Sequence, residues 1–362
     1  MILIIQRYIP NYRIDFFDLI KRRNKNIQIL SSHNYKKSEL YFNKKIVSSN
    51  NKMKVFYKLN LYWIPFIRIF YKYRPKIIII EHNPRILTII PIMIICKVLK
   101  VKFILHGHGG SMKREFSLFN YRDIIHLLLI KCADRYIAYN LFTKNKLLKF
   151  IKDKKIFIAN NTINLENCYK IKNNLKKIDL KNKYKITSKI NLVFLGRIIK
   201  EKKLINFFKS FNKLKNKIDL GLVIIGDGPD KLKIEKYVTK NNIKDIRFMG
   251  YLSKEIEIAE LLIASDIHVC FGYCGLNVVH TMAYGLPTIA FEKSNLNYHS
   301  PEFYYLKHKN NAYLIKEEDE FELAILKIFE NLQIYKNNVD IFAINNLKLN
   351  NMADNYLKAM IF

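Results

Sequence analysis

The sequence predicts an α/β protein made of two doubly wound domains, each built on a parallel sheet. Short β-branched runs alternate with amphipathic stretches of helical length through most of the 362 residues. Within these runs the apolar residues are continuous rather than alternating, which is typical of parallel strands covered on both faces. One stretch dense in Lys and Asn, with weak periodicity, interrupts the pattern near the middle of the chain and indicates a linker.

The first domain is predicted over residues 1–172, and its expected strands are Ile2–Ile5, Lys76–Ile80, Lys102–Leu105, Tyr136–Ala138 and Lys155–Ala159. A linker over 173–189 leads to a second domain over 190–345. Its expected strands are Asn191–Leu195, Leu222–Ile225, Ile246–Met249, Ile267–Cys270 and Thr288–Phe291. A helix within 346–362 is expected to pack back on the first domain. Open sheets of this kind bind ligands at the carboxyl ends of their strands, so we expect a cleft between two facing domains.

The charge of the chain indicates an anionic partner without choosing one. There are 63 Lys and Arg residues against 30 Asp and Glu, a formal charge of +33. Nucleic acid, anionic lipid and phosphorylated small molecules all fit such a field. Lys, Asn and Ile are enriched together along the whole chain, as a biased genome composition would also produce. Because no helix-turn-helix, zinc-finger or RNP-like pattern is present, no nucleic-acid partner is expected.

The apolar segments and the cysteines favour a cytoplasmic location. The segment Met1–Arg7 has no basic region ahead of its apolar run and predicts a first strand rather than a signal peptide. The longest apolar stretch, Ile86–Leu99, contains Pro91 and Lys97 and is shorter than the roughly 20 residues that span a bilayer. The 5 cysteines have no metal-ligand spacing and fit reduced packing thiols.

Three segments of the second half carry candidate chemistry. In the first, a strand ends at Leu195, Gly196 permits a tight exit, and Arg197 and Lys202 follow. Two cations at the carboxyl end of a strand suit a diphosphate group, although a basic loop is also ordinary solvated surface. In the second, Gly226–Pro229 with Asp227 and Gly228 follows a strand, and plain turn chemistry explains it equally well.

The third segment, Phe271–Thr288, predicts a strand, a glycine-containing loop, a helix and a further strand. Gly275 and Leu276 open the helix, and Asn277 follows them. Free backbone N–H groups and the helix dipole at such a start favour an anion.

Taken together, in this order and spacing, the three segments resemble the donor-binding domain of retaining glycosyltransferase family 4, also called glycosyl transferases group 1. The resemblance covers about residues 190–316 and ends with Pro301-Glu302-Phe303 and Asn310–Leu314. It implies the GT-B fold, in which two Rossmann-like domains face a cleft. It also implies a UDP- or GDP-linked sugar as donor substrate, and neither a cofactor nor a metal.

The resemblance assigns roles to individual residues. Arg197 and Lys202 would hold the donor diphosphate, with the amides of Gly275 and Leu276 receiving its distal phosphate. The remaining donor-side candidates are Gly196, Asp227, Gly228, Tyr251, Leu252, Asn277, His280 and Glu302, of which Gly250-Tyr251-Leu252 matches the stretch that contacts the base. In the first half, Leu105–Gly110 looks like the family's His-Gly element, so His106 and His108 join Arg197 and Lys202 as catalytic candidates. A metal at these two histidines is not expected, because no third ligand lies nearby in sequence.

The chain departs from the family pattern where two glutamates usually stand eight positions apart. One commonly touches the donor sugar and the other the ribose hydroxyls, but here the positions hold Gly272 and His280. Either a compensating residue exists or catalysis has been lost. The segment Phe291–Ser300 lacks the usual Gly-Gly pair and supplies Glu292 and His299, beside Glu302, as substitutes.

The acceptor is expected to bind the first domain. The first loop, Gln6–Arg13, lacks the glycines that many relatives use beside the donor, which shifts Tyr12 and Arg13 toward the acceptor side. The segment Lys54–Arg74 mixes aromatic and basic residues around Trp63. Such a segment fits either an anionic membrane surface or a core helix with basic edges.

The sequence therefore predicts a retaining, metal-independent glycosyltransferase. Its acceptor would be a lipid-linked or surface glycan, of the kind used in lipopolysaccharide, O-antigen or capsule biosynthesis, reached at the inner face of the cytoplasmic membrane. Two alternatives stay open: a non-catalytic partner subunit with a transferase fold, which would explain Gly272 and His280, and a basic RNA-binding protein, which would explain the charge.

Overall fold

The computed structural model describes residues 1–31, 49–50, 54–56, 61–112, 116–117, 119–294 and 297–362. The chain divides into two compact units. Unit 1 comprises Met1–Asn164 together with Leu349–Phe362, and unit 2 comprises Leu165–Lys348. Each unit is built around one parallel sheet with helices on both faces, as the sequence predicts.

The described residues of unit 1 form a seven-stranded sheet in the order β3-β2-β1-β6-β7-β8-β9. The bounds of its strands are β1 Ile2–Gln6, β2 Ile27–Ser31, β3 Ser49–Asn50, β6 Ile77–Glu81, β7 Lys102–Gly107, β8 Arg135–Ala138 and β9 Ile156–Ile158. Every neighbouring pair runs parallel. The strand order reverses at β1, so the connections after β1 and β6 leave the sheet at a switch point.

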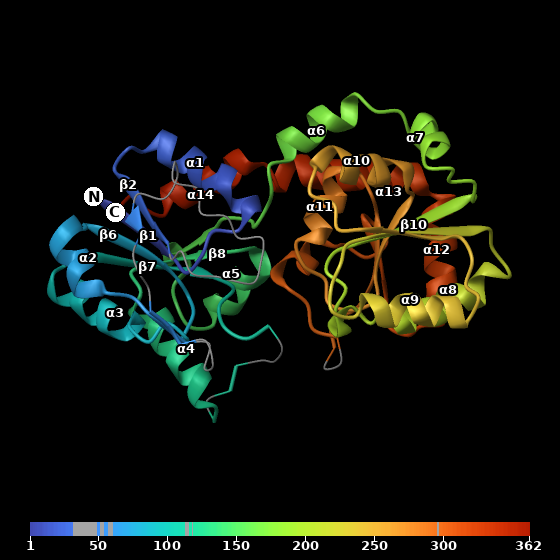
Figure 1. Cartoon of the computed structure of the whole chain (residues 1–362). Coiled ribbons are helices and arrows are strands. Elements are labelled where there is room, and N and C mark those ends of the chain that lie inside the picture. The colour runs from blue at the N-terminus through green and yellow to red at the C-terminus, as the bar shows by residue number, and fades with distance from the viewer. Residues whose placement is uncertain (32–48, 51–53, 57–60, 113–115, 118, 295–296) are drawn as a thin grey trace. The chain divides into compact units, whose positions relative to one another are not determined.

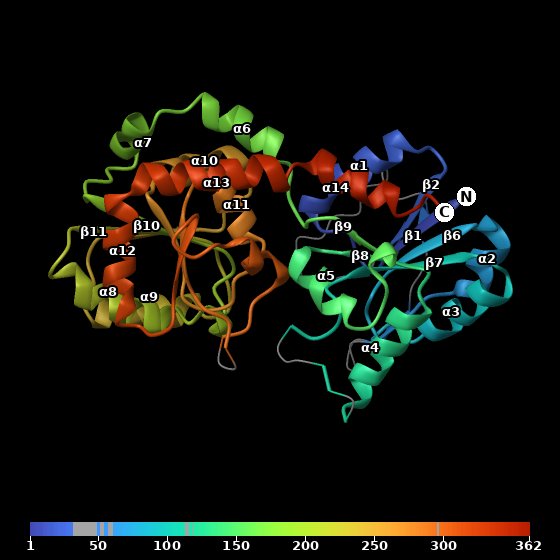
Figure 2. The same cartoon turned by 180° about the vertical axis from the view of Figure 1, so that it is seen from behind.

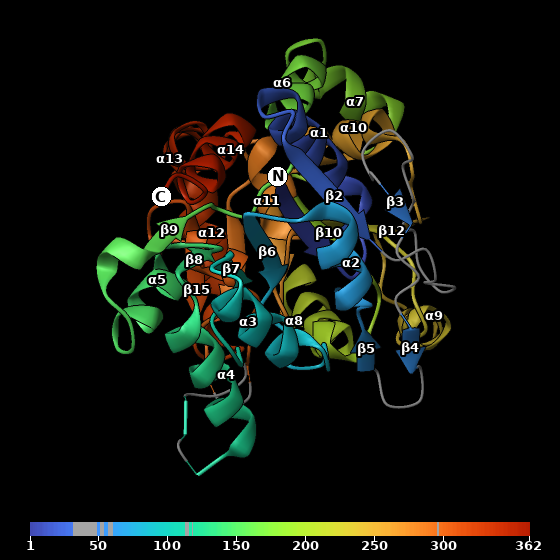
Figure 3. The same cartoon turned by 90° about the vertical axis from the view of Figure 1, so that its left-hand side faces the viewer.

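Two helical layers cover the sheet of unit 1 (Figures 1 and 3). On one face lie α1 (Ile14–Arg23) and the C-terminal helix α14 (Leu349–Lys358). On the other lie α2 (Phe66–Tyr73), α3 (Ile89–Val98), α4 (Tyr121–Cys132) and α5 (Leu141–Leu148). Alternate strand residues feed the two cores: Ile4 and Ile104 pack with α1 and α14, whereas Leu3 and Leu105 pack on the other side.

Two short strands precede α2, where the sequence also allowed a core helix. Strands β4 (Lys54–Phe56) and β5 (Leu61–Trp63) pair antiparallel. Helix α2 begins only after Pro65, whose ring fixes a backbone angle suited to a helix start. Within the predicted patch Lys54–Arg74, residues 57–60 and the side chains of residues 54 and 55 lie outside the described part of the structure.

Unit 2 has a six-stranded parallel sheet in the order β12-β11-β10-β13-β14-β15. The bounds are β10 Ile190–Leu195, β11 Leu220–Ile225, β12 Ile246–Gly250, β13 Ile267–Cys270, β14 Thr288–Phe291 and β15 Ala312–Ile315. The switch point lies between β10 and β13, which pair with each other although β11 and β12 separate them in the chain. Ligands of doubly wound sheets bind beside such a point.

The helices of unit 2 also form two layers (Figure 2). One contains α8 (Leu204–Lys215), α9 (Lys231–Lys240) and α12 (Glu320–Glu330), whose Phe207, Phe211 and Phe321 pack against the strands. The other contains α10 (Glu255–Ala264), α11 (Asn277–Ala283) and α13 (Leu332–Asn346), with α6 (Leu165–Asn173) and α7 (Lys177–Lys183) beside it.

The predicted linker lies within unit 2, and the C-terminal helix packs on unit 1. Residues 173–189 begin at the end of α6 and include α7, and both helices belong to unit 2. Helix α14 packs on α1 and β9 of unit 1. There, Arg23 Nη1 donates to Asp354 Oδ1 at 2.5 Å and the rings of Phe16 and Tyr356 meet at 5.1 Å. Among the helices that the structure describes, none is both long and apolar enough to cross a bilayer.

Candidate functional site

Two connections at the carboxyl edge of unit 2 pack backbone against backbone. The Ile198 N–H donates to the Asp227 carbonyl at 2.8 Å. A Cβ atom at Gly226 would lie 1.9 Å from the Gly196 carbonyl oxygen, and one at Gly228 would lie 2.2 Å from that of Ile198. Glycine is therefore required by this contact, which gives the Gly-Asp-Gly segment a reason beyond ordinary turn chemistry.

Arg197 and Lys202 have different surroundings in this connection. Arg197 is exposed and makes no hydrogen bond or ion pair with any residue the structure describes. Lys202, in the short 3-10 helix Lys200–Lys202, is only 6% exposed. Its Nζ donates to the Tyr273 carbonyl at 2.6 Å and would lie 3.8 Å from a Cβ at Gly196. The structure thus places one predicted cation at the surface and the other against the loop that follows β13.

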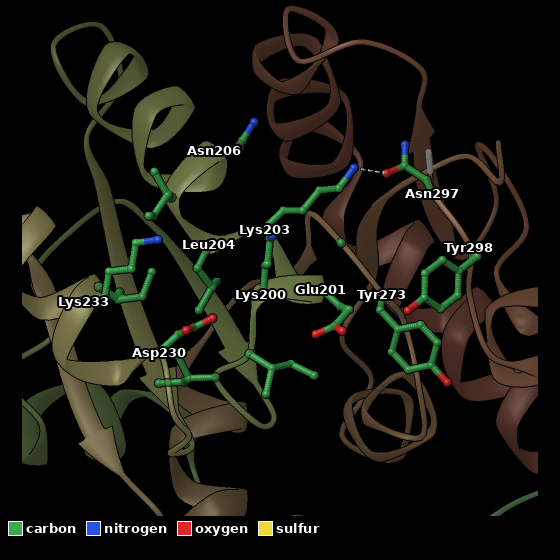
Figure 4. Close-up of a pocket in the computed structure, with 15 residues that line it drawn as sticks. Lys200, Glu201, Lys203, Leu204, Asn206, Asp230, Lys233, Tyr273, Asn297 and Tyr298 are labelled. Atoms are coloured by element: carbon green, nitrogen blue, oxygen red, sulfur yellow. Dashed lines mark hydrogen bonds between the residues drawn. The ribbon is translucent and has the colours of Figure 1, made fainter. Parts of the chain in front are cut away.

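A pocket of about 650 Å³ opens beside these residues, within unit 2 (Figure 4). Its polar and aromatic lining consists of Lys200, Glu201, Lys203, Asn206, Asp230, Lys233, Tyr273, Asn297 and Tyr298. Lys203 Nζ reaches across to Asn297 Oδ1 at 2.5 Å, as the dashed line in Figure 4 shows. The rings of Tyr273 and Tyr298 lie 5.4 Å apart. Basic groups and aromatic faces next to the switch point suit a phosphorylated sugar.

Position 272 has no room for a side chain. A Cβ there would lie 2.0 Å from the Glu201 carbonyl oxygen and 2.7 Å from the carbonyl carbon of Lys202. The Tyr273 N–H donates to the same Glu201 carbonyl at 2.8 Å. The glycine is therefore needed for the close approach of the two loops, and a glutamate could not replace it without moving the backbone.

His299 ties the loop after β13 to the end of β14. Its Nδ1 accepts a hydrogen bond from the Cys274 N–H at 3.1 Å, so the ring proton is on Nε2, which donates to the Phe291 carbonyl at 3.0 Å. The ring stacks on Phe303 with centroids 4.1 Å apart. Burial lowers the pKa of His299 to about 4, with a smaller contribution from the Lys202 charge, although the bond to the Phe291 carbonyl acts in the opposite direction. His299 is thus a neutral brace.

The same brace brings Glu302 beside the Gly275 loop. The Ser300 N–H donates to the Cys274 carbonyl at 3.0 Å, and the Ser300 hydroxyl donates to the Glu302 carboxylate. Ser300 Oγ would lie 3.9 Å from a Cβ at Gly275. Glu302 is 4% exposed. Of the three substitutes that the sequence offered, Glu302 is therefore the carboxylate held next to the loop.

Asn277 and His268 fix the start of α11. The Gly275 N–H donates to Asn277 Oδ1 at 2.9 Å, and Asn277 Nδ2 donates to His268 Nε2 at 3.1 Å. The proton of His268 is then on Nδ1, which donates to Thr288 Oγ1 at 3.1 Å. Burial lowers the pKa of His268 to about 3. The predicted anion-binding amide of Gly275 is thus held by a side chain of its own helix.

His280 is paired with a carboxylate that sequence reasoning missed. Its Nε2 lies 2.7 Å from Glu255 Oε1, and the Tyr284 hydroxyl donates to the same oxygen at 2.6 Å. No signal in the sequence marks this contact, because an acidic first residue of a helix is common without any further role. Tyr251 and Leu252, the predicted base-contacting residues, lie in the connection just before Glu255, and Tyr251 is 53% exposed.

The carboxyl edge of unit 1 contains the two histidines of the Leu105–Gly110 segment. His106 is 1% exposed, and neither ring nitrogen has a hydrogen-bond partner among the residues that the structure describes. Its ring packs between those of Tyr139 and Tyr356, at 4.8 and 5.4 Å. His108 is only half-buried, and burial, Lys146 and His126 lower its pKa to about 4. Of the two, His108 is the one within reach of a ligand.

A tyrosine and two further histidines form a chain of contacts that holds the Leu105–Gly110 segment. The Gly109 N–H donates to the Tyr136 hydroxyl at 2.9 Å, and that hydroxyl lies 2.8 Å from His82 Nδ1. His82 Nε2 lies 3.0 Å from His126 Nδ1. This chain holds the backbone of the His-Gly segment in place.

The acceptor-side candidates Tyr12 and Arg13 differ in access. Tyr12 is 38% exposed and Arg13 is 4% exposed. No described carboxylate pairs with Arg13, whose guanidinium instead lies over the rings of Tyr139 and Phe16 at 5.3 and 5.7 Å. A buried cation without an acidic partner is unusual, since burial of an unpaired charge costs free energy.

Comparison with known proteins decides the family. Residues 176–341 match the model of the family described as Glycosyl transferases group 1. Unit 2 is a group 1 glycosyltransferase domain. The resemblance inferred from the sequence is confirmed.

Curated relatives agree with this assignment. An uncharacterized glycosyltransferase, MJ1069, from Methanocaldococcus jannaschii is 28% identical over 66% of this chain and 62% of its own length. The N-acetyl-alpha-D-glucosaminyl L-malate synthase of Bacillus anthracis is 27% identical over 40% of this chain and 38% of its own length. The matches thus span less than two thirds of these relatives.

Solved structures confirm the GT-B fold over the whole chain. Alr3699/HepE of Anabaena, solved in complex with UDP, has a TM-score of 0.73 at 13% identity and is covered to 99%, as is this chain. The lipopolysaccharide outer core galactosyltransferase WaaB has a TM-score of 0.70 at 14% identity, covering 99% of this chain and 98% of its own. The GT-B fold therefore includes unit 1.

Proposed function

We propose that this group 1 glycosyltransferase is a retaining, metal-independent enzyme that uses a UDP- or GDP-linked sugar. The observation that carries the proposal is the placement of Arg197 and Lys202 at the switch point of the unit 2 sheet, beside a pocket of about 650 Å³. Complexes of HepE with UDP and with UDP-glucose support the donor class.

In the proposed reaction, Arg197 and Lys202 stabilise the negative charge that develops on the departing diphosphate. Lys202 is already oriented by the Tyr273 carbonyl, so it needs little rearrangement. The acceptor hydroxyl attacks the anomeric carbon from the face that the phosphate leaves, and its proton passes to the leaving phosphate oxygen. The configuration is then retained without a dedicated general base.

The test is a comparison of ligands with and without phosphates. Arg197→Ala and Lys202→Met should each weaken UDP binding at least tenfold while leaving uridine binding within twofold, because the lost contacts are to phosphate. Methionine keeps the buried stem of Lys202. Lys209→Ala, an exposed lysine on α8, is the matched control. Equal weakening of UDP and uridine, or no weakening of either, would contradict the diphosphate grip. Calorimetry with UDP, uridine and GDP measures binding by the wild-type protein and the three variants.

A second candidate, a non-catalytic subunit, is favoured by the lack of space at Gly272 and by His280 standing where a glutamate is usual. It predicts donor binding without transfer. Release of UDP from a UDP-sugar, measured with and without candidate lipid-linked acceptors, separates the two functions, since only the enzyme gives acceptor-dependent release.

We further propose that unit 1 binds a lipid-linked or surface-glycan acceptor, of the lipopolysaccharide, O-antigen or capsule type, through Tyr12, Arg13 and His108. The name of the Bacillus relative includes L-malate, an acidic group. An anionic acceptor group is a suitable partner for the buried Arg13 guanidinium.

For such an acceptor we propose docking at the inner face of the cytoplasmic membrane through α2 and α3. Ile67 and Tyr71 of α2 are 72% and 82% exposed, and Val98 of α3 is 73% exposed. A pocket of about 480 Å³ lined by Trp63, Phe66, Arg68 and their neighbours lies at the same surface. Apolar and aromatic groups beside cations are typical of a membrane-contacting face.

The docking proposal is tested with vesicles of phosphatidylglycerol and of phosphatidylcholine. Neutralising Arg68, Lys72 and Arg74 should release the protein from the anionic vesicles only. Ile67→Ser with Tyr71→Ser should reduce binding to both. Unchanged binding of either variant to phosphatidylglycerol contradicts the proposal.

A further inference from the structure

One carboxylate of unit 2 is held by three donors that all reach the same oxygen. Glu255 Oε1 accepts from His280 Nε2 at 2.7 Å, from the Tyr284 hydroxyl at 2.6 Å and from Cys168 Sγ at 3.7 Å. The donors come from α11, from the residue that ends α11 and from α6, so three segments fix one side chain of α10.

The other oxygen of this carboxylate is uncommitted. Oε2 of Glu255 accepts no hydrogen bond from any residue that the structure describes, and the side chain is 29% exposed. Burial raises the pKa of Glu255, but the hydrogen bonds from His280 and Tyr284 outweigh it and the net pKa is lowered. The group is therefore ionised at neutral pH, and an ionised carboxylate only accepts hydrogen bonds.

Glu255 lies at the edge of the sheet where doubly wound proteins bind their ligands. It is the first residue of α10, which leaves the carboxyl edge of the sheet after β12, and His280 lies on α11, which leaves the same edge after β13. A fixed, ionised and partly exposed acceptor at this edge needs a ligand that brings neutral donors, because a carboxylate repels phosphate. In a nucleotide sugar, hydroxyl groups lie on both sides of the diphosphate.

We propose that Glu255 is a specificity-determining residue that accepts a hydrogen bond from a ribose hydroxyl of the donor, and that His280 and Tyr284 are its positioning residues. This rests on the proposed function. Ribose is favoured over the transferred sugar because Glu255 follows the predicted base-contacting residues Tyr251 and Leu252 within the same connection, and ribose carries the base. The pocket with Tyr298 lies instead beside α8 and α9, in the other helical layer.

The consequence is a preference for ribonucleotides over deoxynucleotides. A site that hydrogen-bonds a substrate hydroxyl rejects the analogue lacking it, since the partly buried acceptor then loses its partner. The site thus keeps a carboxylate although position 280 is a histidine, because Glu255 of the neighbouring helix supplies it.

The test measures the binding of UDP, 2′-deoxy-UDP and 3′-deoxy-UDP by calorimetry, with the guanine nucleotides in a parallel series. The wild-type protein should bind the ribonucleotide at least about tenfold more tightly than one deoxy analogue. In Glu255→Ala the ratio of ribonucleotide affinity to deoxy-analogue affinity should fall to within twofold of one, with binding of the deoxy analogue unchanged. Glu255→Gln, which keeps an acceptor oxygen, should retain part of the preference.

Two further variants separate positioning from folding. Tyr284→Phe should lower the ratio severalfold while leaving deoxy-analogue binding unchanged, which a merely unfolded site would not do. Glu257→Ala, on the same helix and 39% exposed, is the matched control and should keep the full ratio.

The outcomes are distinct. A full ratio in Glu255→Ala, or a ratio near one in the wild-type protein, overturns the assignment of Glu255. In another outcome, Glu255→Ala changes the discrimination between donor sugars while the ribonucleotide-to-deoxynucleotide affinity ratio stays the same. That result would replace the ribose contact with a contact to the transferred sugar. Failure of the wild-type protein to bind either ribonucleotide removes the proposed function itself.

Discussion

The carboxyl edges of the two sheets differ in how their polar side chains are bonded. In unit 2, the polar side chains at this edge form hydrogen bonds within the protein, as seen for His268, Asn277, His299 and Lys202. In unit 1, buried polar atoms of Gln6, Arg13, His106 and Tyr356 have no hydrogen-bond partner within the described part of the chain.

The difference indicates that the two edges are prepared for ligand binding to different degrees. Unit 2 is preorganised, so its loops hold their geometry before a ligand binds, which lowers the ordering cost of binding. Unit 1 keeps a buried cation and several unmatched donors, which is costly for folding and is retained where a ligand or solvent is to be engaged.

The largest effect is expected for Gly272→Ala. Its Cβ would lie 2.0 Å from the Glu201 carbonyl oxygen, so the two loops must separate. We expect the free energy of unfolding to fall by about 3 kcal/mol, at the upper end for overpacking. Gly275→Ala on the same loop is the control, because its nearest heavy atom is 3.5 Å away. Equal stability of the two variants in chemical denaturation would show that the loop contact is not rigid.

A smaller effect is expected from acid through His299. Its pKa is about 4 in the folded protein and about 6.5 when unfolded. A lowered pKa means that the contribution is complete above pH 6.5 and is lost as the pH falls toward 4. Between pH 7 and pH 5 the loss should be about 2 kcal/mol. Urea unfolding of His299→Gln should have a flatter pH dependence over this range, and a slope equal to that of the parent would refute the brace.

The smallest effect, with the opposite sign, is expected in unit 1. Arg13→Met removes a buried charge that has no carboxylate partner, so the free energy of unfolding should rise by about 1 kcal/mol. Arg7→Met is the matched control and should destabilise, because the Arg7 guanidinium pairs with Glu81 at 2.8 Å. A loss of stability in Arg13→Met would make this arginine a structural residue and weaken the contrast between the edges.

Much of the fold could be predicted from the sequence because parallel strands are continuous apolar runs. Strands β10 and β13 lie where the sequence places them, within one residue. The hairpin of β4 and β5 could not be predicted, since its aromatic and basic residues also fit a helix. The helices α6 and α7 are polar, and they are stabilised by partners far away in sequence, such as the contact of Lys172 with Asp340.

The site could be predicted only where its residues lie close together in the chain. Gly196, Arg197 and Lys202 follow one strand, so their shared location is local information. The Cys274–His299 and Glu255–His280 contacts each join residues 25 positions apart. Tertiary packing alone brings such pairs together. Likewise, nothing in the spacing of His106 and His108 indicates that the first is interior and the second half-exposed.

Because α14 completes the core of unit 1, the two units can finish folding at different stages of translation. Residues 165–348 are contiguous, so unit 2 can close its core while it emerges from the ribosome. The unit that is translated first must wait for Met352 and Tyr356, which cover Phe16 and the strands beneath it. A nascent chain halted before residue 349 would therefore carry a finished second unit and an open apolar face on the first, the stage at which chaperone binding is most needed.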